Sequence, residues 1–330
     1  MATIIRFYEA GGPEVMRREE MEIPDPGPAE VKIKVAAIGL NRAEMAYREG
    51  RYLDRPRFPS KLGYEAAGTV IGLGSEVRGL AIGERVGVIP NFSMAEYGTY
   101  GAEIVMPSSA VTACPDDVSF ETFAAVWMQY LTAYGALVEI GCLTQGEHVL
   151  ITAASSSVGL AAIQIALALG AVPIATTRTQ RKREALLQAG AAHVIATDEQ
   201  DLVAEMRRLT GNSGARLIFD PIAGPGVETL AKAASTGGTI IIYGGLSAQQ
   251  TAFPGGLAMV RGLAMRGYTL FEVTRNPVRL ARAKEFIYEG LANGKLRPTI
   301  DKSFRLEDIV EAHRYMAKGE QVGKIIVTVP

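Results

Sequence analysis

The sequence has few of the side chains that form disulfides or bind metals, since its 330 residues include only two cysteines and three histidines. Cys114 and Cys142 lie far apart, and we expect each to be a small buried side chain rather than half of a disulfide. This usage excludes a disulfide-stabilised secreted domain and is typical of a reducing compartment.

Long apolar runs and a strong net charge are also missing. The longest apolar stretch, residues 158–169, is too short to span a bilayer, and Arg6 and Glu9 interrupt the start of the chain where a signal peptide needs an apolar core. The formal net charge of −1 argues against a nucleic-acid surface or an acidic tail. We therefore expect a cytoplasmic protein with neither a membrane nor a nucleic acid as partner.

The most informative segment that is present runs from residue 148 to residue 170. It begins as a β-branched run typical of a buried parallel strand and continues as an apolar helix that can start near Ser157 and end at Gly170. The tight turn between strand and helix is typical of a dinucleotide phosphate site. Its residues are Ala154, Ser155, Ser156, Ser157, Val158 and Gly159.

Only the last glycine of the usual G-x-G-x-x-G pattern remains in this turn, with Ala154 and Ser156 at the first two glycine positions. The small size is kept, and serine hydroxyls can supplement the backbone donors. The alternative is a strand–turn–helix without a ligand.

The pattern after this segment favours the ligand site. Strands are predicted at residues 172–177, 193–196, 215–220 and 238–243, with helices at 180–190 and around Leu209. Strands that alternate with helices at this spacing predict a doubly wound parallel sheet of the Rossmann type, with its ligand at the carboxyl ends of the strands.

The end of the second strand indicates which dinucleotide binds. An acidic residue about twenty residues past the turn would accept the ribose hydroxyls of NAD, but Thr177 stands there, with Arg178 and Lys182 just after it. Cations and hydroxyls suit the 2′-phosphate of NADPH, which we predict as the cofactor. The alternative is a solvated basic helix face, which we expect for Arg181 and Arg183.

The N-terminal third is different, with strands at 31–35 and 67–71 and dense turns that predict a β-rich domain. Residues 72–77 begin like a dinucleotide fingerprint but lead into another turn and strand, so we interpret them as a hairpin. The last sixty or so residues carry helices at 277–293 and 306–318 and a strand at 324–329 that we expect to return to the first domain.

The order of these parts resembles the medium-chain dehydrogenase/reductase superfamily, specifically its zinc-free branch around NADPH:quinone oxidoreductases, over essentially the whole chain. The resemblance implies an α/β protein with a GroES-like catalytic domain, residues 1–122 and 268–330, and a Rossmann NADPH-binding domain, residues 123–267. Its landmarks are residues 39–41, 62–68, 83–86, 131–134, 154–159, 219–220, 237–238, 243–244 and 323–324.

Zinc-containing members of that superfamily use a Cys, a His in a Gly-His-Glu motif and a further Cys or acid. Here Asn41 and Arg42 stand where the first thiolate is expected, and Tyr64 replaces the motif histidine. A catalytic zinc needs about three protein ligands, which Glu65 alone cannot supply. We therefore expect no bound metal.

What remains is hydride transfer to an acceptor that needs little Lewis-acid help, such as a quinone or an α,β-unsaturated carbonyl. The resemblance implies that Asn41 and Tyr52 face the nicotinamide and the substrate. The alternatives are that Asn41 caps a helix over residues 43–48 and that Tyr52 only packs. Ala46 stands where relatives often carry another tyrosine, and Tyr47 is expected to face elsewhere.

The resemblance implies further cofactor contacts from Thr132, Tyr243, Gly244 and Lys324. The alternatives are a plain strand-ending glycine for Gly244 and a solvated strand-end lysine for Lys324. Loops 91–100 and 246–256 are expected to shape the acceptor pocket.

Residues 267–271 are predicted to form a sixth, exposed edge strand, which favours a homodimer. The chain is thus expected to be an NADPH-dependent reductase of small electrophiles. The alternative is a non-catalytic NADPH-binding redox sensor or structural protein on the same fold.

Overall fold

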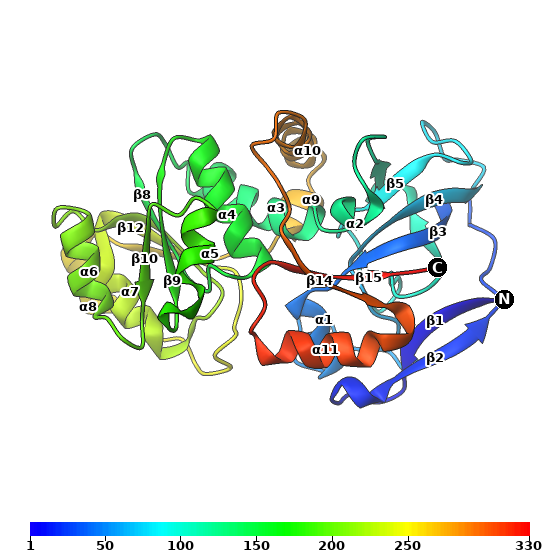
Figure 1. Ribbon diagram of the computed structural model, residues 1–330, viewed down its shortest axis with the longest axis horizontal. Helices are drawn as coiled ribbons and strands as arrows, with labels where there is room; N and C mark the ends of the chain where they lie inside the picture. Colours follow the sequence, from blue (N-terminus) through cyan, green and yellow to red (C-terminus); the bar gives the residue numbers. More distant parts are fainter. The chain divides into compact units, whose positions relative to one another are not determined.

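The computed structural model describes all residues, 1–330, and divides into two compact units. The first unit comprises residues 1–128 and 298–330, and the second comprises residues 129–297. Figure 1 shows a mixed α/β architecture in which each unit is built around its own sheet.

The second unit contains a six-stranded sheet in the order β10-β9-β8-β11-β12-β13, in which all neighbouring strands are parallel. This is the doubly wound parallel sheet predicted from the sequence, and the strand order reverses between β8 and β11. The strands are β8 (His148–Ile151), β9 (Val172–Thr177), β10 (His193–Ala196), β11 (Ala215–Asp220), β12 (Ala234–Ile242) and β13 (Ala264–Gly267).

Helices connect these strands and bury the sheet, as expected for parallel strands with apolar sequences (Figure 1). One cluster of fully buried side chains brings Leu150, Ile174 and Ile218 from three strands against Met206 and Val227 from two helices. The helices are α3 (Trp127–Tyr134), α4 (Ser157–Ala168), α5 (Arg183–Gln188), α6 (Leu202–Leu209), α7 (Val227–Ala233), α8 (Gly255–Arg261), α9 (Phe271–Thr274) and α10 (Pro277–Ala292).

The sixth strand lies earlier than predicted. Gly262 adopts a left-handed conformation and ends α8, so β13 begins at Ala264 and ends at Gly267. Tyr268 still donates a backbone hydrogen bond to Ile242, but the chain then turns into α9. The prediction of a strand at 267–271 was therefore wrong by about the length of the strand, although β13 is the edge strand.

The first unit contains a seven-stranded sheet with the path β14-β15-β3-β4-β5-β7, in which β6 pairs with β3, and a separate β1–β2 hairpin. The closing strand β15 pairs antiparallel with β3, so the C-terminal segment completes the sheet of the first unit, as predicted. This is a GroES-like sheet domain. None of the helices in the structure is long and apolar enough to cross a membrane.

The elements of this unit begin and end as follows: β1 (Ala2–Phe7), β2 (Met16–Met21), β3 (Glu30–Gly39), α1 (Arg42–Arg48), β4 (Glu65–Leu73), β5 (Arg85–Val88), β6 (Glu103–Pro107), β7 (Val111–Ala113), α2 (Phe120–Phe123), β14 (Ile300–Arg305), α11 (Ile309–Lys318) and β15 (Lys324–Thr328). The hairpin interpretation of residues 72–77 agrees with β4 and β5, which pair antiparallel.

The division between units differs from the sequence-based boundaries at the C-terminal side. Residues 268–297, which include α9 and α10, belong to the second unit rather than to the GroES-like unit. The reason is packing, because the Phe286 ring lies against the Tyr134 ring with centroids 5.2 Å apart, and Arg282 forms an ion pair with Glu139.

Candidate active site

The phosphate turn lies between β8 and α4 in the second unit. Ser156 is the N-cap of α4, and its side-chain oxygen accepts a hydrogen bond of 3.1 Å from the backbone N–H of Gly159. The helix begins at Ser157, as predicted. The turn therefore presents a capped helix N-terminus, whose partial positive charge suits a phosphate group.

Gly159 is required for close packing of this helix against the turn. A Cβ atom at this position would lie 2.5 Å from the carbonyl oxygen of Ala154 and 2.6 Å from its Cα. These are backbone atoms that cannot move aside without shifting the turn. The one glycine retained from the usual fingerprint thus keeps the role of its third glycine, the close approach of helix and strand.

Replacing Gly159 with Ala should destabilise the second unit by about 1–3 kcal/mol, because the new methyl group overpacks the turn. It should also weaken the binding of NADPH measured by protein fluorescence. Gly226→Ala is the matched control, since Gly226 has an ordinary helical φ of −58° and no atom lies within 4 Å of the position that its new methyl group would occupy. Equal stability and affinity for both variants would contradict this account of the turn.

The strand ends beside the turn carry a buried polar cluster. The Thr152 hydroxyl donates to the carboxylate of Asp220, which also accepts backbone N–H bonds from Ile222 and Ala223. The Tyr243 ring stacks on Phe219 with centroids 4.0 Å apart, and burial raises the pKa of Tyr243 well above its ordinary value. These residues lie at the carboxyl ends of β8, β11 and β12, where the strand order reverses, which is the usual ligand position in such sheets.

Gly244 follows Tyr243, and a Cβ there would lie 2.8 Å from the carbonyl oxygen of Pro221. Packing against the Pro221 backbone is therefore sufficient to explain this glycine. The contacts of Tyr243 and Gly244 with a cofactor stay predictions.

The basic residues predicted to select the cofactor occupy different environments. Lys182 donates a hydrogen bond of 3.2 Å to the Ser155 hydroxyl in the phosphate turn, and the exposed Arg178 forms no ion pair within the chain. Arg183, which was expected on a solvated helix face, instead donates to the carbonyl of Val194 and so holds the neighbouring strand. Lys182 is thus the cation beside the phosphate turn, and Arg178 directly follows Thr177 at the end of β9. Arg183 has a structural role.

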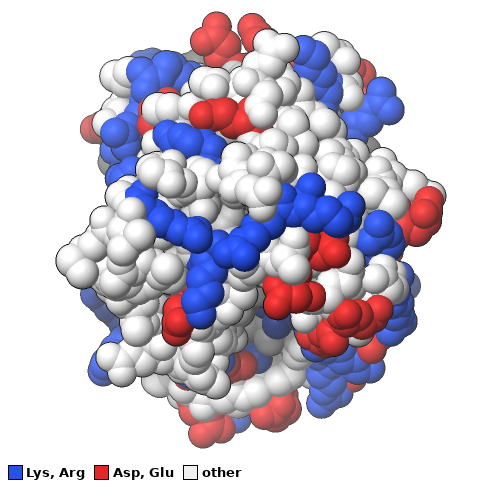
Figure 2. All heavy atoms as spheres, turned by 90° about the vertical axis from the view of Figure 1, so that its left-hand side faces the viewer, with Lys and Arg blue, Asp and Glu red and all other residues white.

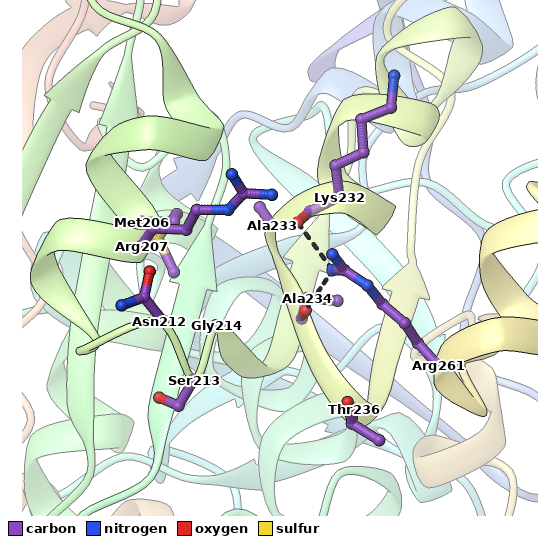
Figure 3. Close-up of a pocket in the computed structure, with 10 residues that line it drawn as sticks. All are labelled: Met206, Arg207, Asn212, Ser213, Gly214, Lys232, Ala233, Ala234, Thr236 and Arg261. Carbon is purple, nitrogen blue, oxygen red and sulfur yellow. Dashed lines mark hydrogen bonds between the residues drawn. The ribbon is translucent and has the colours of Figure 1, made fainter.

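A second basic group lies at the opposite, amino-terminal end of the strands. Figure 2 shows a connected band of Lys and Arg side chains on the face that includes α6 and α8. In Figure 3, Arg207, Lys232 and Arg261 border a hollow of about 150 Å³. Arg261 donates to the carbonyls of Ala231, Lys232 and Ala234 at the end of α7, and Lys232 pairs with Glu228. Two of these three cations therefore stabilise the protein itself.

In the first unit, Asn41 lies at the centre of a buried network. Its Oδ1 accepts a 2.7 Å bond from Lys324, and the two hydrogens of its Nδ2 are shared among acceptors on Gly39, Glu44 and Glu65 at 3.1–3.3 Å. Asn41 is also the N-cap of α1, where Glu44 accepts a 2.7 Å bond from the Asn41 backbone N–H. The capping alternative considered from the sequence is therefore present. A direct contact of Asn41 with cofactor or substrate stays a prediction.

Lys324 is only 1% exposed and forms an ion pair with Glu65, which is fully buried. Glu65 also accepts a backbone bond of 2.9 Å from Met128. A buried pair of this kind is held in place by its extra hydrogen bonds. The Lys324 ammonium thus has two partners in its own unit, Asn41 and Glu65. The alternative of a solvated strand-end lysine was therefore wrong.

A second branch of the network leads from Glu44 to the C-terminal helix α11. Tyr100 donates a 2.6 Å bond to Glu44, and the two nitrogens of His313 contact the Tyr100 hydroxyl at 2.9 Å and the Arg48 guanidinium at 2.6 Å. Because Arg48 can only donate, Nδ1 of His313 must accept and Nε2 must carry the hydrogen. Burial raises the pKa of Glu44, and burial beside Arg48 lowers the pKa of His313 to about 3.

The lowered pKa of His313 predicts a dependence of stability on pH. The unfolded chain binds a proton near the ordinary pKa of 6.5, whereas the folded protein does so only near 3. The free energy of unfolding should therefore fall as pH is lowered from about 6.5 toward 3, by up to about 1.4 kcal/mol per pH unit from this group. Urea unfolding of the wild type and of His313→Gln isolates the effect, because the variant amide can make both bonds but does not titrate. A difference between the two proteins that stays constant across this range would contradict the assignment.

Tyr52 lies beside Tyr64, the tyrosine that stands where a zinc-containing relative has its motif histidine. The rings of Tyr52 and Tyr64 are 6.1 Å apart between centroids, and Tyr64 also packs against Phe92 at 5.7 Å. Burial raises the pKa of Tyr52 to about 12, so its hydroxyl is protonated at neutral pH. Tyr47, as expected, faces elsewhere, with its hydroxyl 2.8 Å from that of Ser60.

The remaining predicted residues are buried or lie in loops. Thr132 is buried on α3, and the neighbouring Tyr130 donates a 2.7 Å bond to Gln164. A hollow of about 470 Å³ is bordered by Gln250 and residues 252–257, together with Gly224, Pro225 and Glu228. The predicted roles of Thr132 and of loops 91–100 and 246–256 are not tested by these contacts. Cys114 and Cys142 are both free, but Cys142 is exposed rather than buried as expected.

The donor set does not fit a catalytic metal. No group of three or more His, Cys, Asp or Glu side chains lies in an arrangement that could hold an ion. Asn41 and Tyr64 stand where ligands would be needed, and Glu65 is paired with Lys324.

Comparison with known proteins agrees with the two-unit architecture. Residues 27–139 match the model of the alcohol dehydrogenase GroES-like domain, and residues 157–283 match the model named zinc-binding dehydrogenase. Human quinone oxidoreductase is 31% identical over 330 residues, covering 98% of this chain and 96% of its own length.

Solved structures extend the comparison. Escherichia coli quinone oxidoreductase complexed with NADPH has a TM-score of 0.91 at 29% identity, with 99% of each chain covered. CurK enoyl reductase has a TM-score of 0.89 at 25% identity, covering 100% of this chain and 99% of its own. The chain therefore belongs to the medium-chain dehydrogenase/reductase superfamily, in its quinone oxidoreductase-like branch.

Proposed function

We propose that this protein is an NADPH-dependent oxidoreductase that reduces a quinone or an α,β-unsaturated carbonyl without zinc. The observation that carries the proposal is the pair of cations, Arg178 and Lys182, beside a capped phosphate turn that has no carboxylate at Thr177. The similarity of the chain to a quinone oxidoreductase and to an enoyl reductase supports this class of acceptor.

In the second unit, the turn from Ala154 to Gly159 would hold the pyrophosphate through backbone N–H groups and serine hydroxyls. Lys182 and Arg178 would hold the 2′-phosphate by charge-assisted hydrogen bonds. Thr132, Tyr243 and Gly244 would contact the remainder of the cofactor. When bound, NADPH supplies a hydride from the nicotinamide ring.

In the first unit, Tyr52 is the group that acts on the acceptor. Its ring meets that of Tyr64, and its hydroxyl, whose pKa burial raises to about 12, is protonated at neutral pH and can donate to an acceptor oxygen. The proton moves to that oxygen as negative charge develops there, and solvent then restores it to Tyr52. The Asn41 side-chain amide lies in the same unit. Its hydrogen bonds with Glu44, Glu65 and Lys324 fix its orientation.

The experiment is to follow oxidation of NADPH, and separately of NADH, with a small panel of quinones, enones and alcohols. Each reaction is run with and without a chelator. The proposal expects chelator-insensitive oxidation of NADPH by a quinone or an enone, with much slower use of NADH. Tight NADPH binding without turnover on any acceptor would instead favour a non-catalytic sensor.

We also propose that the protein is a homodimer in a reducing, cytoplasmic environment. The edge strand β13 is exposed, and Met259 and Val260 on the neighbouring helix α8 are 84% and 83% exposed. An exposed strand edge next to apolar side chains is suited to pairing about a two-fold axis. Sedimentation of the wild type should give the dimer mass, and Val260→Lys with Met259→Lys should give the monomer. A monomeric wild type at micromolar concentration would refute this.

A further inference from the structure

The hollow in Figure 3 carries positive charge and has no acidic residue in its lining. Its cations come from three different helices, with Arg207 on α6, Lys232 on α7 and Arg261 on α8. The rest of the lining is uncharged and includes the polar side chains of Asn212 and Thr236. Cations gathered around one hollow repel each other unless a negative charge lies among them. The arrangement therefore favours a bound anion.

The acids of the same helices do not supply this negative charge to the two arginines. Glu205, the only acid of α6, pairs with Arg208 at 2.7 Å. Glu228, the only acid of α7, pairs with Lys232 at 2.9 Å. Helix α8 contains no acid. The two arginines that line the hollow thus have no carboxylate partner.

Both arginines also have unused hydrogen-bond donors. Arg261 bonds the carbonyls at the end of α7 through Nη1 alone, so its Nη2 and Nε make no hydrogen bond within the chain. The Arg207 side chain is exposed and forms neither a hydrogen bond nor an ion pair. In Figure 3 the two side chains extend toward Ala233 from different sides of the hollow. Because a guanidinium presents its N–H groups in a planar fork that matches phosphate, two of them can hold one phosphate group.

The size and position of the hollow limit what it can bind. Its volume of about 150 Å³ is that of roughly five water molecules in the liquid. Such a space suits a phosphate group, whereas pockets for larger ligands measure roughly 300 Å³ or more. The hollow lies at the amino-terminal ends of two strands, since Gly214 precedes β11 and Ala234 begins β12. The phosphate turn lies at the opposite, carboxyl ends, so the hollow is separate from the site proposed for NADPH.

We propose that this hollow is a phosphate-binding site, in which Arg207 and Arg261 together hold one phosphate group. The group is either free inorganic phosphate or the terminal group of a small phosphorylated molecule. The Thr236 hydroxyl and the Asn212 amide make no hydrogen bond to the chain and line the same hollow, so they are further donors. Binding joins α6 to α8 and uses none of the residues proposed for reduction, so the site is independent of the proposed function.

The binding test is a calorimetric titration with inorganic phosphate, with NADPH at saturation so that the cofactor site is occupied. The wild type should bind one phosphate per chain. Arg207→Gln should raise the dissociation constant about tenfold, as expected for one charge-assisted hydrogen bond, and should fold normally because this side chain has no partner in the chain. The control is Arg208→Gln, the next residue on α6, which should leave the constant unchanged. Absence of binding by the wild type, or equal weakening in the two variants, would overturn the proposal.

A competition experiment distinguishes the two sources of phosphate. Phenyl phosphate that displaces inorganic phosphate would identify the terminal group of a larger molecule as a ligand, and phenyl phosphate that does not compete would identify a site for the free ion. The urea midpoint of the wild type should also rise more in phosphate than in chloride of equal ionic strength, and Arg207→Gln should lack part of this rise. An equal rise in both proteins would show a general salt effect and reject the site.

Discussion

Replacing both Arg178 and Lys182 with Ala should raise the KM for NADPH about 100-fold while changing that for NADH little. Each side chain is expected to make a charge-assisted hydrogen bond to the 2′-phosphate, a group that NADH lacks, and two such bonds contribute about 3 kcal/mol or more. The change should leave kcat at saturating NADPH nearly intact, because the 2′-phosphate lies far along the cofactor from the reacting ring.

The matched control is Arg181→Ala, which removes an exposed cation from the same short segment. We expect it to change neither KM. Because Lys182 also bonds Ser155 in the phosphate turn, the single variants should be measured as well. Equal losses with NADPH and NADH would show that the two cations support the turn rather than select the cofactor.

Replacing Lys324 with Met should destabilise the first unit by about 3–5 kcal/mol, the usual cost of removing one partner of a buried ion pair. Glu65 would remain fully buried without its cation, and the Oδ1 atom of Asn41 would lose its donor. The C-terminal strand β15 carries Lys324 against β3, so the loss should appear as a lower urea midpoint for the unfolding of this unit.

The matched variant is Lys324→Met combined with Glu65→Gln, in which no charge is left unpaired. It should recover a large part of the lost stability, because the main cost is the uncompensated carboxylate rather than the missing attraction. A double variant no more stable than Lys324→Met alone would assign the cost to packing instead.

The second unit was predictable because its signals are local. Strands β9, β10 and β11 have the predicted limits, since each is a short apolar run between turn residues. The start of α4 was predictable from Ser156 and the small residues beside it. The sixth strand was misplaced because 264–267 has no alternating pattern, and the turn at Gly262 that determines its start is one glycine among many.

The polar network of the first unit was not predictable in the same way. Glu44 and His313 are far apart in the sequence, and only the fold brings them to the two sides of Tyr100. Glu44 did carry one local signal, since an acid three residues after an Asn is a capping pattern. Tyr64 was noticed only as the absence of a histidine. Its ring contact with Tyr52 depends on the conformation of residues 53–63. The periodicity of apolar residues in a sequence does not predict such a conformation.

The central claim is direct hydride transfer to the acceptor in a site without zinc. The most direct measurement uses NADPH deuterated at the transferred position of the nicotinamide C4, an enone acceptor, and protein whose metal content has been determined. The account predicts deuterium at the β-carbon of the product and a primary isotope effect on turnover, with far less than one zinc per chain. Turnover that requires stoichiometric zinc, or a product without deuterium, would contradict it.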